Sequence, residues 1–309
     1  MKKMNELLVK KELNENTTYS EFLEDMDCLF QNLEELYGMY DYFGKDKFES
    51  AHQKMRELPS ENFALRWGMN ELRKALKFVK DGHFSIGEAR PYVREYAYAV
   101  RYSTFHGIPM IDCKKFWADD DEEEKQLEEF ANKGADYRND EKLIIDFRGN
   151  YGGSSTYIFK FLEGLTGGEV GFSSRFLQRW SGLYTEYLLE KGVTYKPEHV
   201  NEWEESKVDK IPNEKIIYVL FDERSASAAE EGIAILRNME NVVLVGNHSA
   251  GMGTCGNCLP IYLPHSHIRV YFGTGLLLYE GIGNVDADGG FKGDISYEDF
   301  ENSFEDTKA

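Results

Sequence analysis

KIIYVLFDERSASAAEEG, residues 215–232, runs from a short apolar segment straight into a segment rich in alanine and acidic residues. Residues 216–220 are apolar almost without interruption, which is typical of a strand buried on both faces. Ala226, Ala229 and Ile233 then recur at helical spacing. The stretch therefore predicts a buried strand that turns at once into a helix, the unit from which α/β sheets are built.

Ser227 lies at the start of the predicted helix. Backbone N–H groups there have no partner within the helix, and the helix dipole favours negative charge. This environment suits a nucleophilic hydroxyl and an adjacent oxyanion, and the turn is similar to a nucleophile elbow without its glycines. Ser225 and Ser227 are also typical of helix caps, and this segment alone favours that interpretation over a nucleophile.

A second unit of the same kind is KLIIDFRGNYGGSS, residues 142–155. Its buried strand ends in a turn where Gly152 and Gly153 let the backbone approach a ligand and present bare N–H groups, as an oxyanion hole requires. The same glycines also fit an ordinary strand-to-helix turn. A third apolar strand, residues 242–245, precedes GNHSAGMG, so three strands alternate with helical stretches and predict an α/β sheet.

These motifs, in this order, resemble the serine peptidase family that contains the C-terminal processing proteases and the tricorn core. KLIIDFRGNYGG, LFDERSASAAE and VVLVGNHSAGMG are similar to the family's glycine turn, nucleophile segment and following glycine turn. YEGIGNVDAD, residues 279–288, is similar to its closing motif, with one extra residue and Ala287 where proline is usual. The resemblance implies a ClpP/crotonase-like core, Ser227 as nucleophile, and a peptide or protein substrate. It implies no cofactor.

One departure from the family bears on how the serine is activated. The C-terminal processing branch uses a lysine in the glycine turn after the third strand, and Met252 occupies that position. A thioether cannot accept a proton, so the resemblance points to the tricorn-like branch, which uses histidine and glutamate. We expect His83, in DGHFSIG, to be the base, because histidine accepts protons near neutral pH. Glu280 matches the branch's supporting glutamate.

Alternatives remain for both roles. His83 fits a surface or capping histidine as well, and His248 is the second candidate base because it follows the third strand. Asp286 and Asp288 are alternatives to Glu280, since the extra residue makes the match uncertain by one position. For the oxyanion we expect the amides of the Gly152–Gly153 turn and of Ala228.

Two cysteines in TCGNC, Cys255 and Cys258, precede His265 and His267, a spacing compatible with zinc or a redox pair. No βαβ pattern of the thioredoxin type surrounds them, and the histidines flank a hairpin-like stretch, so we predict no metal site.

The chain of 309 residues carries a formal net charge of −19, which argues against binding nucleic acid. No apolar run is long enough to span a membrane, and the first twenty residues do not resemble a secretory signal. We therefore expect a cytoplasmic protein, with export through a leader outside this chain as the alternative. The sequence makes no prediction of oligomeric state.

The predicted organisation is an N-terminal helical bundle over residues 1–82 and a peptidase-like α/β core over residues 83–309. The stretch from Pro91 to Lys142 is too short for the peptide-binding PDZ module of many processing proteases. Aromatic and apolar residues from Phe172 to Leu188 recur at helical spacing and predict a helix that either packs on the core or covers the cleft.

The predicted function is a serine-type peptidase that forms an acyl-enzyme on Ser227, with His83 as base and Glu280 as support. The alternative is a catalytically inactive member of the fold that binds an apolar ligand or a protein partner.

Overall fold

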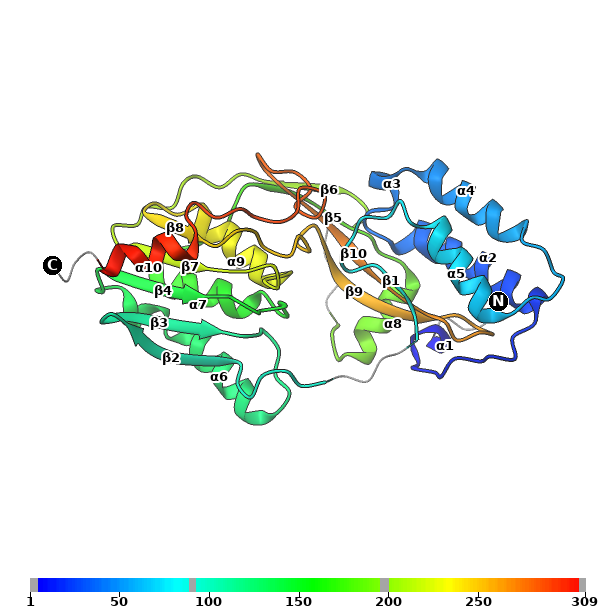
Figure 1. Ribbon diagram of the computed structural model, residues 1–309, viewed down its shortest axis with the longest axis horizontal. Coiled ribbons are helices and arrows are strands. Elements are labelled where there is room, and N and C mark those ends of the chain that lie inside the picture. The colour runs from blue at the N-terminus through cyan, green and yellow to red at the C-terminus, as the bar shows by residue number, and fades with distance from the viewer. Residues whose placement is uncertain (1–4, 89–92, 195–199, 306–309) are drawn as a thin grey trace. The chain divides into compact units, whose positions relative to one another are not determined.

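Figure 1 shows a computed structural model of the chain, which describes residues 5–88, 93–194 and 200–305. The chain forms two compact units, each built from several segments. The first unit comprises Met1–Tyr92, Phe176–Glu204 and Cys255–Leu277, and the second comprises Val93–Arg175, Glu205–Thr254 and Leu278–Ala309. This division differs from the boundary expected between residues 82 and 83, because two later segments pack with the N-terminal helices.

The second unit contains a five-stranded sheet with the order β2-β3-β4-β7-β8. Its strands are β2 (Val100–Phe105), β3 (Ile108–Cys113), β4 (Lys142–Asp146), β7 (Ile216–Leu220) and β8 (Val242–Val245). β2 and β3 form an antiparallel hairpin, whereas β3, β4, β7 and β8 are parallel. The three strands predicted from sequence are thus adjacent, and the α/β sheet is confirmed.

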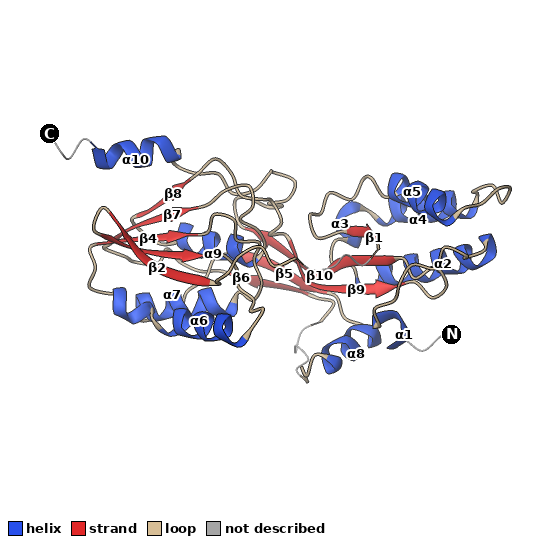
Figure 2. Ribbon diagram, turned by 60° about the horizontal axis from the view of Figure 1, so that its bottom comes forward, coloured by secondary structure: helices blue, strands red, loops and turns tan. Residues whose placement is uncertain are grey.

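Helices cover both faces of this sheet, as Figure 2 shows for α6 and α7 on one face and α10 on the other. The unit's helices are α6 (Asp121–Asn132), the 3₁₀ helix η1 (Gly134–Tyr137), α7 (Thr156–Thr166), α9 (Ala228–Arg237) and α10 (Tyr297–Glu305). Phe300 of α10 packs in a buried cluster with Ile144, Leu220 and Val245 of the sheet. Apolar residues on both faces explain why the central strands read as continuous apolar runs.

The first unit is largely helical at its N-terminus, as predicted. Its helices are α1 (Asn5–Leu8), α2 (Tyr19–Leu36), α3 (Tyr40–Phe43), α4 (Lys45–Arg56), α5 (Leu65–Ala75) and α8 (Gly182–Glu190). Thr18 begins α2 with a capping box, in which Thr18 N–H donates to the Glu21 carboxylate at 2.8 Å. Phe22, Met26 and Leu29 are fully buried on the inner face of α2.

A second sheet has the order β1-β10-β5-β6, with β9 also paired to β10. Its strands are β1 (Ser85–Gly87), β5 (Ser174–Gln178), β6 (Trp203–Ser206), β9 (Cys255–Tyr262) and β10 (Arg269–Tyr279). Three of the five boundaries between the two units fall within β5, β6 and β10, and the other two follow Tyr92 and Thr254. The described residues contain no evident PDZ-type module, and none of their helices is long and apolar enough to cross a membrane.

The helix predicted from Phe172 to Leu188 is wrong in its first half. β5 occupies Ser174–Gln178, and only α8, Gly182–Glu190, is helical. Leu177 of β5 is buried, and the Phe176 ring lies against Gly275 of β10. Pairing with β10 therefore overrides a spacing of aromatic residues that also suited a helix.

Candidate active site

Ser227 joins β7 to α9 in a strained backbone conformation. Its φ is 53° and its ψ is −121°, a combination that residues with a Cβ rarely adopt. Such strain costs on the order of 1–3 kcal/mol and persists only where the surrounding structure enforces it. A serine held this way at a strand-to-helix turn has the geometry of a nucleophile elbow.

The glycine turn after β4 packs directly against this elbow. Gly152 has a φ of 96°, and a Cβ placed on it would lie 2.7 Å from both the Ala226 oxygen and the Ser227 Cβ. Gly153 has a φ of 127°, and a Cβ placed on it would overlap the carbonyl of Phe116. Only glycine fits at these two positions, because neighbouring backbone approaches each of them closely.

Buried polar groups tie the glycine turn to the elbow. Asn150 is fully buried, and its backbone carbonyl accepts a hydrogen bond from the Ala226 N–H at 2.8 Å. Asn150 Nδ2 also donates to the Cys113 carbonyl at the end of β3, at 3.0 Å. Ser225 Oγ donates to the Phe147 carbonyl at 2.7 Å. Ser225 therefore adds a side-chain bond to the backbone bond between the two turns.

The three amides expected to bind an oxyanion differ in their surroundings. The Gly152 N–H donates to Asn150 Oδ1 at 2.8 Å, so this donor is already used. The Gly153 N–H and the Ala228 N–H have no hydrogen-bond acceptor within the described part of the chain. Ala228 is the first residue of α9, where an amide without a helical partner is expected.

Glu230, one turn after Ser227, is a buried acid that the sequence reasoning missed. Its carboxylate accepts hydrogen bonds from Ser249 Oγ (2.5 Å), Gly251 N–H (2.9 Å), Met252 N–H (2.7 Å) and Ser227 N–H (3.3 Å). Burial raises the pKa of Glu230 to about 7, although the Ser249, Met252 and Gly251 hydrogen bonds oppose that rise. This carboxyl links the elbow to the glycine turn after β8. An acid on the apolar face of AAEEGIAIL was the available sequence signal.

The turn after β8 carries neither a lysine nor a base bonded to Ser227. Met252 is half-buried and contributes its backbone N–H to Glu230. His248 is exposed, and its Nδ1 lies 2.8 Å from the Ser249 carbonyl. Among the described residues, no hydrogen bond joins the His248 ring to Ser227.

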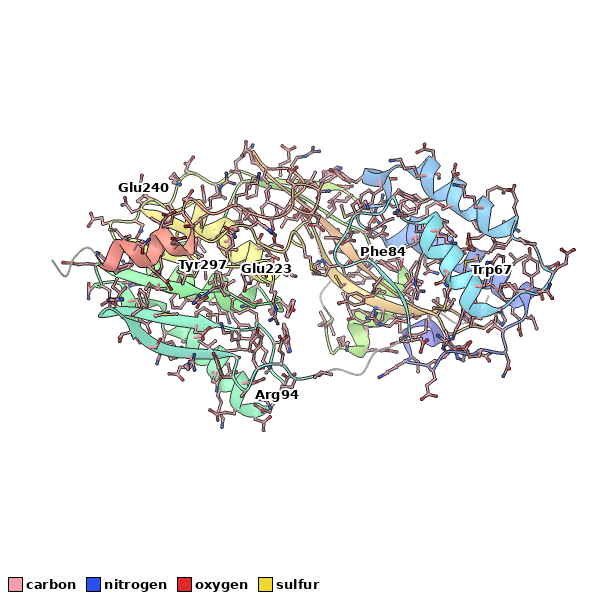
Figure 3. The ribbon with its side chains drawn as sticks, in the orientation of Figure 1. Trp67, Phe84, Arg94, Glu223, Glu240 and Tyr297 are labelled. Atoms are coloured by element: carbon pink, nitrogen blue, oxygen red, sulfur yellow. The ribbon has the colours of Figure 1, made fainter. Side chains whose placement is uncertain are left out.

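His83 belongs to the first unit, in the turn between α5 and β1, and its side chain is 11% exposed. Its backbone N–H donates to Asp81 Oδ1 at 2.8 Å, and its ring Nδ1 lies 4.0 Å from the same oxygen. The next residue, Phe84, is labelled in Figure 3, and its ring lies 5.4 Å from that of Tyr37 between centroids. Aromatic packing and a buried carboxyl thus define the turn. Ser227 and His83 come from different units.

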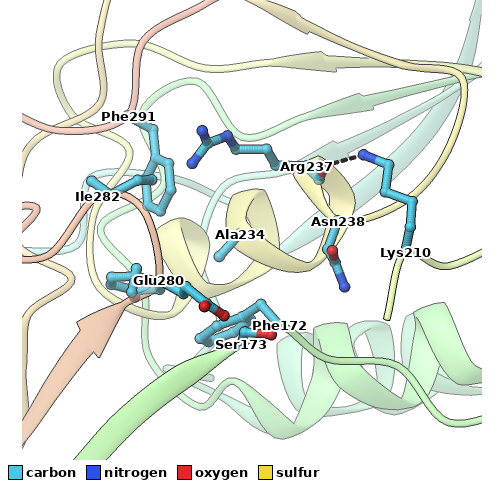
Figure 4. Close-up of a pocket in the computed structure, with 10 residues that line it drawn as sticks. Phe172, Ser173, Lys210, Ala234, Arg237, Asn238, Glu280, Ile282 and Phe291 are labelled. Atoms are coloured by element: carbon cyan, nitrogen blue, oxygen red, sulfur yellow. Dashed lines mark hydrogen bonds between the residues drawn. The ribbon is translucent and has the colours of Figure 1, made fainter. Parts of the chain in front are cut away.

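Glu280 lies on the wall of a pocket of about 330 Å³ in the second unit, together with Ser173, Arg237 and Phe291 (Figure 4). Its exposed carboxylate is 2.6 Å from Lys207 Nζ, and this hydrogen bond is the main cause that lowers the pKa of Glu280. The hydrogen bonds of the described residues join this carboxylate to Lys207 and Ser173 and not to Ser227.

The second candidate carboxylate, Asp286, lies nearer to the glycine turn that follows β8. Its Oδ1 accepts the Thr254 N–H at 2.8 Å, and its charge helps to raise the pKa of Glu230.

Cys255 and Cys258 form no disulfide within the described part of the chain, and Cys255 is buried. Within residues 5–88, 93–194 and 200–305, no group of three or more His, Cys, Asp or Glu side chains is placed to hold a metal ion.

The chain resembles known proteins in its sequence and in its fold. The sequence profile described as Peptidase family S41 matches residues 99–274, more than half of the chain. No curated protein matches the chain.

Several solved structures share the fold. Mature CPAF complexed with lactacystin has a TM-score of 0.63 and 13% identity, covering 94% of this chain and 98% of that one. A lipoprotein from Streptococcus agalactiae has a TM-score of 0.54 and 13% identity, covering 97% and 100%. The photosystem II D1 C-terminal processing protease has a TM-score of 0.52 and 10% identity, covering 90% and 93%.

Proposed function

The chain belongs to peptidase family S41 and is a serine-type peptidase of peptide or protein substrates, and from this premise we propose that Ser227 is its nucleophile and His83 its base. The observation that carries the proposal is the backbone of Ser227, a non-glycine residue with a φ of 53° at the start of a helix. Strain of this kind concentrates at functional sites because it fixes a reacting group in place.

The proposed reaction is acyl transfer. The His83 imidazole accepts the Ser227 Oγ proton while Oγ forms a bond to the carbonyl carbon, and the carbonyl electron pair moves to the oxygen. The amides of Gly153 and Ala228 bind this oxyanion, and each such donor typically contributes about 3 kcal/mol to lowering the barrier. The tetrahedral intermediate then expels the amine, which takes the proton from the imidazolium. A water molecule, deprotonated by His83, then attacks the acyl-enzyme. The acid is released, and Ser227 Oγ takes its proton back from the imidazolium.

His83 is proposed as the base because the position of the family lysine is Met252, which offers Glu230 only its backbone N–H. Histidine is the side chain best suited to exchange a proton near neutral pH. Glu280 remains the predicted supporting carboxylate from the closing motif. Its Oε1 accepts a hydrogen bond from Lys207 Nζ at 2.6 Å.

The proposal is tested by treating the full chain with a fluorophosphonate at neutral pH and mapping the adduct by peptide mass spectrometry. We expect the adduct on Ser227 and its complete loss in Ser227→Ala. Ser225→Ala is the matched control, because this neighbouring serine has a structural partner in Phe147, and it should still be labelled at Ser227. Folded wild-type protein that carries no adduct at Ser227 would contradict the proposal and favour an inactive binding protein.

A further inference from the structure

Asp81 is a buried carboxyl two residues before His83 in the first unit. Its side chain is fully buried and receives hydrogen bonds from Tyr37 Oη at 2.7 Å and from the His83 N–H at 2.8 Å. The Cys255 thiol also hydrogen-bonds to it. These groups come from the end of α2, from the turn itself and from the start of β9. Segments far apart in the sequence therefore fix this one carboxyl.

The hydrogen bonds of Asp81 supply no positive charge to offset that of its carboxylate. Its hydrogen-bond partners are neutral groups, and in the described residues the His83 ring is its partner at ion-pair distance, with Nδ1 4.0 Å from Oδ1. Burial raises the pKa of Asp81, while the Tyr37, His83 and Cys255 hydrogen bonds oppose the rise. A buried carboxylate needs a positive partner, and a protonated imidazole beside it would supply one.

The turn has a second property that points the same way. Asp81 Oδ1 both accepts the His83 N–H and lies nearest the ring Nδ1, so the same oxygen holds the backbone and faces the ring. The Asp81 backbone carbonyl accepts the Phe84 N–H at 3.1 Å, which closes the turn on its other side. Asp81 therefore holds the backbone that carries the imidazole and lies at ion-pair distance from its ring.

We propose that Asp81 is the positioning residue of His83, which orients the ring through the turn and stabilises the imidazolium formed when the ring accepts the serine proton. This assigns to Asp81 the supporting role that the closing motif suggests for Glu280. The inference rests on the proposed function, in which His83 is the base. A carboxylate beside a catalytic histidine has this effect on both the tautomer and the charge of the ring.

The test is the rate of fluorophosphonate labelling at Ser227 as a function of pH, measured on the full chain. In the wild type, we expect the rate to rise as the base loses its proton and then to reach a plateau. Asp81→Asn should lower the plateau at least 100-fold and move the midpoint down by about one pH unit, because the imidazolium loses its carboxylate. A merely structural role would lower thermal stability without moving the midpoint.

Asp25→Asn is the matched control. Asp25 is an equally buried aspartate of the same unit, and it accepts hydrogen bonds from Ser266 Oγ and the His265 N–H instead of from the His83 turn. Its loss should reduce stability and leave the pH midpoint of labelling unchanged. An Asp81→Asn profile that matches the Asp25→Asn profile would overturn the inference.

Two further variants separate the possible failures. A wild-type rate in His83→Ala would contradict the base itself, whereas a slow His83→Ala beside a normal Asp81→Asn would overturn only the role of Asp81. If the pH midpoint falls in Glu280→Gln and not in Asp81→Asn, Glu280 is the supporting residue, and the inference about Asp81 is overturned.

If Asp81→Asn does not fold, Tyr37→Phe is used for the test. It removes one donor to the carboxyl and should lower the plateau several-fold, and an unchanged plateau would overturn the inference.

Discussion

Ser227 and His83 are held in place by different means. The Ser227 elbow is fixed mainly by backbone groups, with Gly152 packed against it and the Ala226 N–H bonded to the Asn150 carbonyl. The His83 turn is built around a buried side chain, Asp81, which is bonded to Tyr37, and the Phe84 ring packs beside Tyr37. The nucleophile therefore depends mainly on close packing of the main chain, whereas the base depends on a buried side chain.

The two turns should therefore be sensitive to different kinds of substitution. The elbow should be disturbed most by atoms added to the backbone, because its neighbours leave no space. The histidine turn should be disturbed most by the loss of the Asp81 carboxyl or of the ring, because that carboxyl bonds both Tyr37 and the His83 backbone. Glu230 is the one side chain of the described residues that bonds the Ser227 backbone: its buried carboxyl accepts hydrogen bonds from the Ser227, Gly251 and Met252 amides.

Removing the base should have the largest effect. His83→Ala is expected to lower the rate of labelling at Ser227 by roughly 10²–10⁴-fold, while the adduct stays on Ser227 because the elbow is built without His83. The rate is measured under conditions where the reagent is in excess. His248→Ala is the control and should leave the rate within about twofold; a large drop there would make His248 the base and break the comparison.

The Glu230 carboxyl should make stability depend on pH. The folded state holds its proton to about pH 7, whereas an unperturbed glutamate releases it near pH 4.5, so unfolding releases a proton between these values. Stability should therefore fall as pH rises across that window, by on the order of 3 kcal/mol from this group. Urea unfolding at several pH values, compared with Glu230→Gln, measures this part of the slope.

Glu231→Gln sharpens the interpretation of Glu230. Burial also raises the pKa of Glu231, but its carboxyl is bonded to Ser155 instead of to the elbow. Both variants should lose part of the pH slope, and only Glu230→Gln should slow labelling at Ser227. Equal labelling rates in the two variants would show that Glu230 does not hold the elbow.

Crowding of the elbow is tested by adding one carbon. Gly152→Ala should lower the free energy of unfolding by about 3 kcal/mol, because the new Cβ combines strain at positive φ with overlap against Ala226 and Ser227. Gly107→Ala is matched in φ, at +80°, with nothing within 4 Å of the new Cβ. It should cost about 1 kcal/mol, and equal costs for the two variants would exclude crowding.

The smallest effect is expected at Ser225. Ser225→Ala removes the hydroxyl that accepts the Asp222 N–H at 3.0 Å, so stability should fall by about 1–2 kcal/mol. Labelling at Ser227 should persist, because the hydrogen bond between Ala226 and Asn150 remains. Ser154→Ala, at an exposed neighbouring position, serves as the control for thermal denaturation. Loss of labelling in Ser225→Ala would make the elbow depend on a side chain after all.

The same contrast explains what could be predicted from the sequence. The strands around Ile144 and Val219, and the turn that carries Ser227, follow from local signals: β-branched runs, glycines and helical spacing. These signals are local because backbone geometry is set largely by neighbouring residues. Gly152 and Gly153 indicated a close approach to a ligand, whereas the neighbours that require glycine at these positions are Ser227 and Phe116.

The rest depends on contacts between distant segments. Asp81 is bonded to Tyr37, 44 residues away, and no local pattern predicts that pairing. Glu230 is an acid on a buried helix face, and its hydrogen-bond donors, the Gly251 and Met252 amides, come from a turn about twenty residues away. The strand at Phe176 was predicted as a helix because its spacing suits both, and pairing with β10 decides the outcome.

The most direct test of the account is a crystal structure of the protein after phosphonylation of Ser227. The account predicts a ring nitrogen of His83 about 2.6–3.2 Å from the Ser227 oxygen, or joined to it through one water. A structure in which another side chain occupies that position, with the His83 imidazole turned away from it, would contradict the account.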